Sequence, residues 1–398
     1  MGFEPGRIFA LALASIGLLT PFAIHLFLPV TPVLKSAFGI SDALAQISFS
    51  LPLLVMAFAN LVYGALADRY GRRPVLLSGL ALFLLGSLLG MLADSITTLI
   101  VARVVQAIGA GCGTTLVRAI ARDAYGPEKL VKVISYLTMF YTLGPMVSPT
   151  VAGLLLDHFT WRAVMIFSFA SGAIIMLGTY FFVPETRPGV KLEAGQSMLG
   201  NYRELFAHPR FIAYVLQPGF STAVFFSLSA ASAYVMKDML HRPSTEFGLY
   251  FFLFPLGFFC GNFISSRFGN RAPHEIMVLA GSLILTASVV AILSLLMLGY
   301  LHPLAIFLPG FFNPFAQGIA MPYAQSAAMQ IVPRLAGTAA GVAIFTQSFL
   351  GAIFTQIYGT MADGTLKPMI IVTGVGAALC LFFGSIPFIL RMRERAKA

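Results

Sequence analysis

Charged residues are scarce in this chain of 398 residues, since Asp, Glu, Lys and Arg together make up only 10%. Soluble domains carry about 25% charged residues, and their apolar share, glycine included, is about 45–50%. Hydrophobic residues alone reach 58% here, which excludes a soluble globular protein and an intrinsically disordered one. Because a bilayer-spanning helix needs about 20 apolar residues, the hydrophobic residues of the chain are enough for roughly eleven or twelve spans. The composition predicts a polytopic membrane protein.

Cysteine is also rare, with Cys112, Cys260 and Cys380 each inside an apolar run. Their odd number and wide spacing exclude a disulfide framework and a CxxC metal site, so we expect three buried thiols that act as small hydrophobic groups. No HExxH, GxSxG or Walker A motif is present. The glycines of 109–113 (GAGCG) lie in an apolar run without a preceding strand, and close helix packing explains them better than a phosphate loop. We therefore expect no enzyme, no metal and no cofactor.

Apolar runs separated by charged residues, proline and glycine predict twelve membrane helices. These helices are expected at 8–33, 45–66, 75–93, 98–120, 131–156, 161–183, 211–236, 246–266, 276–299, 303–329, 338–360 and 368–390. One long polar connection, 184–209, separates a first six-helix bundle (1–183) from a second (210–398). The expected fold class is an all-α membrane protein with twelve transmembrane helices in two pseudo-symmetric six-helix bundles.

Basic residues are distributed unequally between the two ends of these helices. With the N-terminus inside, nineteen of the 25 Lys and Arg residues fall on the inner side, five fall outside, and Arg103 lies within a span. This bias is the positive-inside signal, so both termini and the linker 184–209 are expected in the cytoplasm. The net charge of +10 then lies beside anionic lipid headgroups and needs no nucleic acid to explain it.

A short motif occurs at equivalent places in the two halves. Residues 68–73 (DRYGRR) follow the second expected helix, and residues 266–271 (SRFGNR) follow the eighth. The first Arg, the aromatic residue, the Gly and the final Arg correspond. The repeat indicates a gene duplication, and two similar halves suit a transporter that rocks about a central site.

Two ionisable groups are expected at membrane depth, His25 and Arg103, while no carboxylate is expected there. An Arg at a helix centre costs roughly 2.5–3.5 kcal/mol, which favours a cavity-facing Arg in the transport path over one that only bonds neighbouring carbonyls. His25 is either a satisfied core histidine or a proton carrier, because its unperturbed pKa is about 6.5. Pro21 and Pro29 flank it by one turn and are expected to break the first helix and free carbonyl groups.

Uncharged polar residues extend this set. Gln106 and Thr114 share a helical face with Arg103, and the counterpart helices of the second half carry Gln217, Asn313 and Gln317. The expected substrate cavity is lined by His25, Arg103, Gln106, Thr114, Gln217, Asn313 and Gln317. Phenylalanines crowd the second half, and a minority facing the cavity would supply an apolar wall for lipophilic ligands.

Several of these motifs resemble those of the major facilitator superfamily. Residues 64–74 (GALADRYGRRP) are similar to its loop 2–3 signature, and residues 102–109 (ARVVQAIG) to its helix 4 motif. Residues 143–149 (LGPMVSP), with Gly153, are similar to the helix 5 motif of the drug/proton antiporters. Three further motifs resemble the Bcr/CflA-like drug-efflux branch, namely Leu28-Pro29, Trp161-Arg162 and residues 184–186 (PET).

The resemblance implies roles for two groups of residues. The cytoplasmic gating motif comprises Gly64, Asp68, Arg69, Gly71, Arg72 and Arg73, and the antiporter helix 5 motif comprises Gly144, Pro145, Pro149 and Gly153. Asp68 is expected to contact the start of helix 11 near Gly337–Thr338, where a carboxylate complements the helix dipole. The alternative is that Asp68 only pairs with a neighbouring Arg.

The resemblance also implies a function. We expect a monomeric secondary transporter of the bacterial inner membrane, in contact with lipid, that exports small lipophilic drugs or xenobiotics by proton antiport. The branch usually has an acidic residue shortly before the Leu-Pro of helix 1, and His25 stands there instead. Our hypothesis is that His25 carries the proton while Arg103 sets the charge balance, which favours neutral or weakly anionic substrates.

Two alternatives remain open at the level of sequence. One is a specific exporter or importer of a single metabolite, with or without proton coupling. The other, from a different class, is a membrane receptor or scaffold that transports nothing. Broad drug resistance, flux of one compound, or no flux would distinguish these readings.

Overall fold

The computed structural model of the chain describes residues 6–186, 198–268 and 272–395. Every regular element in these ranges is helical, as expected. Eleven helices of the described residues are long and apolar enough to span a membrane. The expected fifth helix, 131–156, is not among them, because it includes side chains outside the described set.

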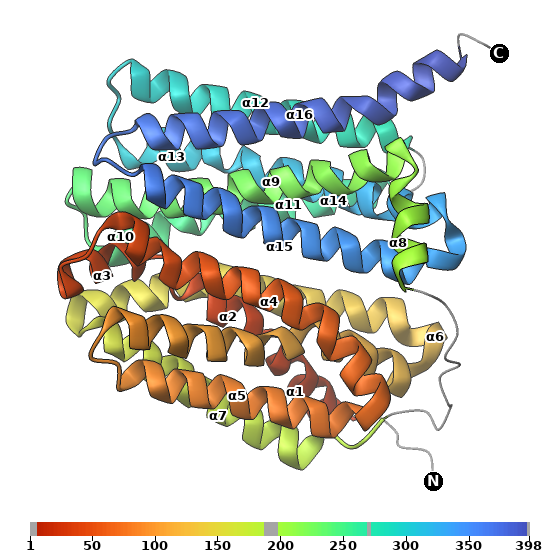
Figure 1. Ribbon diagram of the computed structural model, residues 1–398, viewed down its shortest axis with the longest axis horizontal. Helices are drawn as coiled ribbons and strands as arrows, with labels where there is room; N and C mark the ends of the chain where they lie inside the picture. Colours follow the sequence, from red (N-terminus) through yellow and green to blue (C-terminus); the bar gives the residue numbers. More distant parts are fainter. Residues whose placement is uncertain (1–5, 187–197, 269–271, 396–398) are drawn as a thin grey trace. The chain divides into compact units, whose positions relative to one another are not determined.

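The first compact unit comprises Met1–Glu193 together with Pro243–Gly248. Its helices are α1 (Arg7–Gly17), α2 (Leu19–His25), α3 (Thr31–Phe38), α4 (Asp42–Tyr70), α5 (Arg72–Met91), α6 (Ile96–His158) and α7 (Trp161–Phe182). Helix α6 packs against α1, α2, α4 and α5, and α5 also packs against α7 (Figure 1). Most of the ionisable and polar side chains of interest in this unit therefore lie on or against α6.

The second compact unit comprises Ala194–Arg242 and Leu249–Ala398. Its elements are α8 (Met198–Phe206), α9 (Pro209–Tyr234), the π-helical turn Val235–Met239, the end of α10 (Ser244–Phe251), α11 (Leu253–Phe268), α12 (His274–Met297), α13 (Pro303–Gly310), α14 (Phe312–Ile331), the 3-10 turn Pro333–Leu335, α15 (Ala336–Met361) and α16 (Lys367–Arg395). The first five residues of α10 belong to the first unit. Helix α9 packs against α14, α15 and α16 (Figure 1). Helix α8 lies within the expected linker, where buried Leu205 and the ring of Phe206 pack toward α9.

Four helix breaks each occur four residues before a proline. The last helical residues and the prolines that follow are Gly17 and Pro21, His25 and Pro29, Phe251 and Pro255, and Gly310 and Pro314. Proline has no N–H, so the carbonyl four residues earlier loses its helical donor. The expected helices 8–33, 246–266 and 303–329 are therefore each built from shorter pieces. The break that Pro21 and Pro29 predict in the first helix is confirmed.

Helix α6 contains both the fourth and the fifth expected helices. A straight helix of its 63 residues would be about 95 Å long, about three times the thickness of a bilayer core. Gly113 lies against Thr20 of α2, and Gly144 lies against the adjacent Pro21. Both halves of α6 thus contact one short helix, so the chain reverses direction between Gly113 and Gly144 while its backbone stays helical. The expected non-helical connection at 121–130 is wrong.

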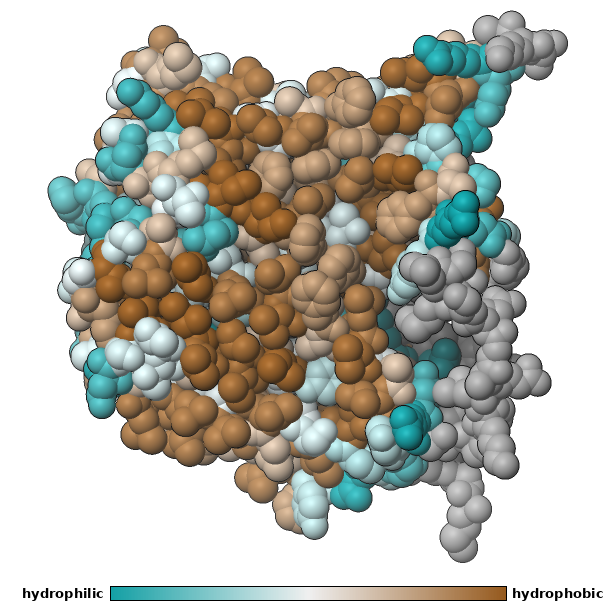
Figure 2. All heavy atoms as spheres, in the orientation of Figure 1, coloured by the Kyte–Doolittle hydropathy of each residue, from teal (hydrophilic) through white to brown (hydrophobic). Residues whose placement is uncertain are grey.

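The hydrophobic surface follows the long axes of the helices. Hydrophobic side chains cover most of the visible length of the helices, and hydrophilic side chains gather toward their ends (Figure 2). Of the cysteines, Cys112 and Cys380 are buried but Cys260 is only half-buried. The expectation of three buried thiols is wrong for Cys260, which lies on α11 between the exposed rings of Phe259 and Phe263.

Candidate functional site

Arg103 is the centre of a buried polar network in the first unit. Its guanidinium donates to the Ala23 carbonyl at 2.8 Å, to the Ser48 carbonyl at 3.4 Å and to the side-chain oxygen of Gln106. It also lies 4.0 Å from the centre of the Phe27 ring, within the range of a cation–π contact. Arg103 is 3% exposed, and among the described residues no carboxylate contacts it.

Both carbonyls that Arg103 binds are available because their helices are interrupted. Ser48 precedes Pro52 by four residues, and proline cannot donate to it. The Ala23 carbonyl lies near the end of α2, where the N–H of Phe27 turns to the Ile24 carbonyl instead. The arginine therefore donates to backbone oxygens that would otherwise be buried without a donor, which costs about 1–3 kcal/mol each.

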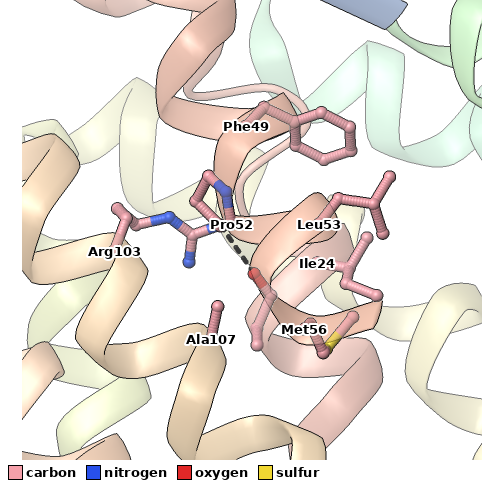
Figure 3. Close-up of a pocket in the computed structure, with 8 residues that line it drawn as sticks. Ile24, Phe49, Pro52, Leu53, Met56, Arg103 and Ala107 are labelled. Atoms are coloured by element: carbon pink, nitrogen blue, oxygen red, sulfur yellow. Dashed lines mark hydrogen bonds between the residues drawn. The ribbon is translucent and has the colours of Figure 1, made fainter. Parts of the chain in front are cut away.

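A small pocket lies beside the guanidinium, between α2, α4 and α6. Its wall is formed by Ala23, Ile24, Phe49, Pro52, Leu53, Met56, Arg103 and Ala107 (Figure 3). The free volume is about 10 Å³, which is near the minimum for one water molecule. Arg103 is the one charged group in this otherwise apolar wall, so a molecule admitted here meets a cation with no carboxylate partner nearby.

His25 is the last residue of α2 and is 5% exposed. It does not line the pocket, whereas Ala23 and Ile24 of the same helix do. Side chains two residues apart in a helix point in directions about 200° apart around the helix axis. The imidazole of His25 therefore points away from the pocket wall that Ala23 forms. Arg103 and His25 are thus joined through α2, because the guanidinium bonds the Ala23 carbonyl two residues before the histidine.

Gln106 and Thr114 lie on the same face of α6 but differ in their burial. Gln106 is fully buried, accepts from Arg103 and donates to the Ser87 hydroxyl of α5 at 2.8 Å. It therefore orients Arg103 and ties it to α5, and it does not line the pocket. Thr114 is half-buried one turn beyond Ala110. Sequence reasoning missed Ser87, because a hydroxyl in an apolar helix carries no distinct signal.

In the second unit, two of the three expected cavity residues make separate hydrogen bonds between helices, and the third has no hydrogen-bond partner among the described residues. Gln217 of α9 donates to the Ser282 hydroxyl of α12 at 3.1 Å, and Gln317 of α14 donates to the Thr222 hydroxyl of α9 at 2.7 Å. Asn313 of α14 is fully buried, and neither of its amide atoms has a hydrogen-bond partner among the described residues. Gln217 thus joins α9 to α12, and Gln317 joins α14 to α9.

The motif of residues 64–73 builds a charged junction between helices. Arg72 pairs with Asp68 at 2.6 Å and with Asp123 of α6 at 2.9 Å. Gly71 has φ 101°, a conformation that favours glycine. Asp68 therefore pairs with a neighbouring arginine. The helix 11 contact stays a prediction, because Gly337 lies outside the residues whose side chains are described.

Glu185 completes this junction from the segment after α7. Its carboxylate accepts from the backbone N–H groups of Arg72, at 2.9 Å, and Arg73, at 3.1 Å. These are unpaired N–H groups at the start of α5, and a negative side chain there satisfies them and complements the helix dipole. Residues 184–186 were singled out only by resemblance, and this contact gives Glu185 a physical role.

Removing the cap on α5 is expected to destabilise the first unit. Glu185→Ala should lower the free energy of unfolding by about 1 kcal/mol, as for other lost N-terminal caps. Thermal unfolding of the purified protein in detergent measures the effect. The control is Glu394→Ala, which removes an exposed ion pair to Arg210 and should change stability less. Equal melting temperatures for wild type and Glu185→Ala would contradict this role.

The glycines of the helix 5 motif lie where neighbouring backbone or side chains leave no room for a Cβ. Gly144 lies against Pro21 of α2, and Gly153 lies against the backbone of Ser244 and Thr245. A Cβ at Gly153 would come within 2.7 Å of the Thr245 Cα. Pro145 and Pro149 lie between these glycines without interrupting α6.

Comparison with known proteins gives consistent matches along the chain. The model of the Major Facilitator Superfamily matches residues 13–355. A bicyclomycin resistance protein homolog of Haemophilus influenzae is 25% identical, over 92% of this chain and 92% of that protein. Multidrug resistance protein D of Escherichia coli is 28% identical, over 89% of this chain and 90% of that protein.

Solved structures of transporters share the fold. A D-xylose–proton symporter matches with a TM-score of 0.78 at 14% identity, over 95% of this chain and 96% of that one. A bacterial homolog of the human lysosomal transporter Spinster matches with a TM-score of 0.75 at 20% identity, over 97% and 96%. Because the family model covers most of its length, the chain belongs to the Major Facilitator Superfamily, as a multi-pass membrane transporter and not an enzyme, and its relatives belong to the drug-efflux branch.

Proposed function

We propose that this transporter exports small lipophilic drugs or xenobiotics, neutral or weakly anionic, in exchange for protons. The names of its relatives, a bicyclomycin resistance homolog and a multidrug resistance protein, support the export of drugs. The observation that carries the substrate class is Arg103, which lines an apolar pocket and bonds only neutral oxygens. Transport follows from alternating access of the two units, as in other transporters built from repeats.

The charge of Arg103 sets which compounds are favoured. The described residues provide no carboxylate to neutralise the guanidinium, so its positive potential extends into the pocket. A second cation at about 5 Å would be repelled by roughly 3 kcal/mol at an effective dielectric constant of 20. An anionic or strongly polar neutral group would be attracted instead. The pocket has room for about one water molecule, so a lipophilic body would fit between the apolar walls from α2 and α4 only if the pocket widens.

Proton coupling is assigned to His25. The described residues include no acidic side chain in α1 or α2, which leaves the imidazole as the titratable group of this segment. A proton on His25 would place positive charge at the C-terminal end of α2, where the helix dipole favours it. It would also place a second positive charge on the helix that Arg103 binds. Protonation would thus bias the two conformations differently, which is the requirement for coupling.

The remaining parts of the proposal concern placement and assembly. The bias of basic residues supports an orientation with both termini in the cytoplasm, and the bacterial relatives support the inner membrane. We propose a monomer, because the superfamily resemblance implies one.

A compound panel tests the substrate class. The transporter is expressed in a bacterium that lacks its main efflux pumps, and accumulation and growth inhibition are measured for neutral, weakly anionic and cationic compounds. Neutral and weakly anionic compounds should accumulate several-fold less than in cells with an empty vector, and cationic compounds should be unchanged. The Arg103→Ala variant, expressed to the same level, is the control.

The outcomes of this panel separate the alternatives. Export confined to one compound would favour a specific metabolite transporter over a drug exporter. Preferential export of cationic compounds would contradict the role given to Arg103. A panel without any flux would contradict the transport function itself and favour a receptor or scaffold.

A further inference from the structure

A second arginine lies on the same face of α6 as Arg103. Each residue of an α-helix is turned by about 100° from the one before it, so the side chains of residues 103, 107, 114 and 118 point within about 60° of one another. Ala107 lines the pocket beside Arg103, Thr114 is half-buried, and Arg118 is exposed. Arg118 lies about 22 Å further along the helix than Arg103. These four residues form what we call the arginine face of α6.

The arginine face lies between the contacts of α6 with α2 and with α4. On one side, a Cβ at Gly113 would come within 3.1 Å of the hydroxyl oxygen of Thr20 in α2, and this hydroxyl donates to the Ala110 carbonyl at 2.9 Å. On the other side, a Cβ at Gly111 would come within 2.9 Å of the Cβ of Ala59 in α4. The pocket is enclosed by the same three helices. The arginine face therefore continues from the pocket along the line between α2 and α4.

Arg118 does not share the apolar outer side of this part of α6. Val101, a large hydrophobic residue that is 54% exposed, points about 160° away from Arg103 and about 100° away from Arg118 around the helix axis. Arg118 instead lies near enough to Tyr141, in the second half of α6, for its charge to act on the phenol group. A guanidinium that faced hydrocarbon would be costly, so this placement suits an arginine that meets water and polar solutes.

The charge of Arg118 is not compensated by a nearby carboxylate. In the part of the chain that the structure describes, no acidic side chain forms an ion pair with it. The next acidic residue along α6, Asp123, is already paired with Arg122 at 3.5 Å and with Arg72 at 2.9 Å. The arginine face thus carries an exposed cation at one end and a buried cation at the other.

We propose that Arg118 is the first binding point for lipophilic compounds that carry a carboxylate, which then pass along the arginine face to Arg103. The inference rests on the proposed export function. In the proposed orientation, Arg118 lies toward the cytoplasm, from which an exporter takes its substrate. The pocket beside Arg103 has a free volume of only about 10 Å³, so a compound meets Arg118 before the pocket widens. Because about 22 Å separates the two positions, a small molecule contacts the two arginines in turn.

This order of contacts gives the two arginines different effects on transport. An exposed cation raises the local concentration of anions and speeds their association, and salt screens this attraction. Arg118 should therefore act on the affinity of the first complex and on KM, with little effect on kcat. Neutral compounds gain nothing from the attraction, so their binding should not depend on Arg118.

Binding of two matched probes to the purified full-length protein in a nonionic detergent tests the proposal. The probes are 2-naphthoate, whose carboxylate is ionised at pH 7, and the neutral 2-naphthamide. Arg118→Gln should weaken the binding of 2-naphthoate about fivefold, the size expected for one exposed ion pair, and leave 2-naphthamide unchanged. Raising sodium chloride from about 0.05 to about 0.5 M should weaken 2-naphthoate binding to the wild type more than to the variant.

Two further variants separate the charge of Arg118 from general surface charge. Arg118→Lys keeps a positive charge at the exposed position and should retain most of the affinity for 2-naphthoate. The matched control is Arg122→Gln, which removes another exposed arginine one turn further along α6, one that is paired with Asp123. It should leave the affinity for both probes unchanged. Melting temperatures equal to that of the wild type verify that each variant is folded.

The outcomes decide the proposal without a transport assay. Absence of 2-naphthoate binding to the wild type, unchanged affinity in Arg118→Gln, or an equal loss in Arg122→Gln would each overturn it. It would also be overturned if phosphatidylglycerol added to the micelles removed the difference between wild type and Arg118→Gln, because Arg118 would then hold a lipid phosphate.

Flux of the same probes into proteoliposomes keeps this proposal distinguishable from drug export. The proposal expects Arg118→Gln to raise the KM for 2-naphthoate about fivefold at an unchanged kcat. Binding through Arg118 in a protein that moves neither probe would keep the binding point and reject export. Export of 2-naphthamide together with unchanged 2-naphthoate affinity in Arg118→Gln would keep export and reject the binding point.

Discussion

Replacing Arg103 with alanine is expected to reduce drug flux about 100-fold while leaving the protein folded. The guanidinium is the one charged group of the pocket wall, and a lost contact to a charged group of about 3 kcal/mol corresponds to this factor. The effect on stability should be small. Two carbonyls lose their donor, at about 1–3 kcal/mol each, but the cost of burying a cation, roughly 2.5–3.5 kcal/mol, is removed.

Flux into proteoliposomes and thermal unfolding, measured on the same preparations, check this expectation. Arg103→Lys keeps the charge but cannot reach three acceptors in one plane, so it should retain part of the flux. Arg162→Ala removes a half-exposed arginine in the first turn of α7 and serves as the control. Normal flux in Arg103→Ala would show that this arginine only bonds neighbouring carbonyls and has no role in transport.

Replacing His25 with glutamine is expected to abolish the stimulation of flux by a pH gradient while preserving downhill flux of the drug. Glutamine keeps hydrogen-bonding capacity but cannot take up a proton, so binding and the conformational change can proceed without coupling. His25→Ala should give the same loss of stimulation. The measurement is drug flux into proteoliposomes with and without an imposed pH gradient, for each variant.

The control for this prediction is His302→Gln, which alters the histidine that caps the start of α13. Its stimulation by the gradient should equal that of the wild type. Undiminished proton-coupled efflux in both His25 variants would remove His25 from the coupling role and leave the drug-export proposal standing on Arg103 alone.

The fold was predictable where a single kind of residue decides the local structure. Long apolar runs located the spans, and the prolines of the first expected helix predicted its breaks, because a missing N–H leaves the carbonyl four residues earlier without a donor. Other prolines, such as Pro52 of α4 and Pro218 of α9, lie inside uninterrupted helices, so proline alone does not decide where a helix breaks. The reversal inside α6 was not predictable in this form. The expected helices ended at residue 120 and began again at residue 131, whereas helical backbone continues through this position.

The candidate site was predictable only in part. Arg103 could be found because a charge in an apolar run is costly and therefore conspicuous. Its partners could not, since two of them are backbone carbonyls that every sequence contains. The cap formed by Glu185 joins residues more than a hundred positions apart, and a single sequence gives no measure of such pairs. For Gln217 and Gln317, helix position alone did not show which neighbouring helix each side chain contacts.

The most direct test of drug/proton exchange is a counterflow of protons measured in the absence of any other energy source. Purified transporter is placed in proteoliposomes with a pH-sensitive dye, and a neutral or weakly anionic drug gradient is imposed at equal pH on both sides. Drug movement in one direction should drive proton movement in the other, and His25→Gln should remove the proton signal but keep the drug flux. Drug flux without any pH change in wild-type vesicles would contradict proton antiport.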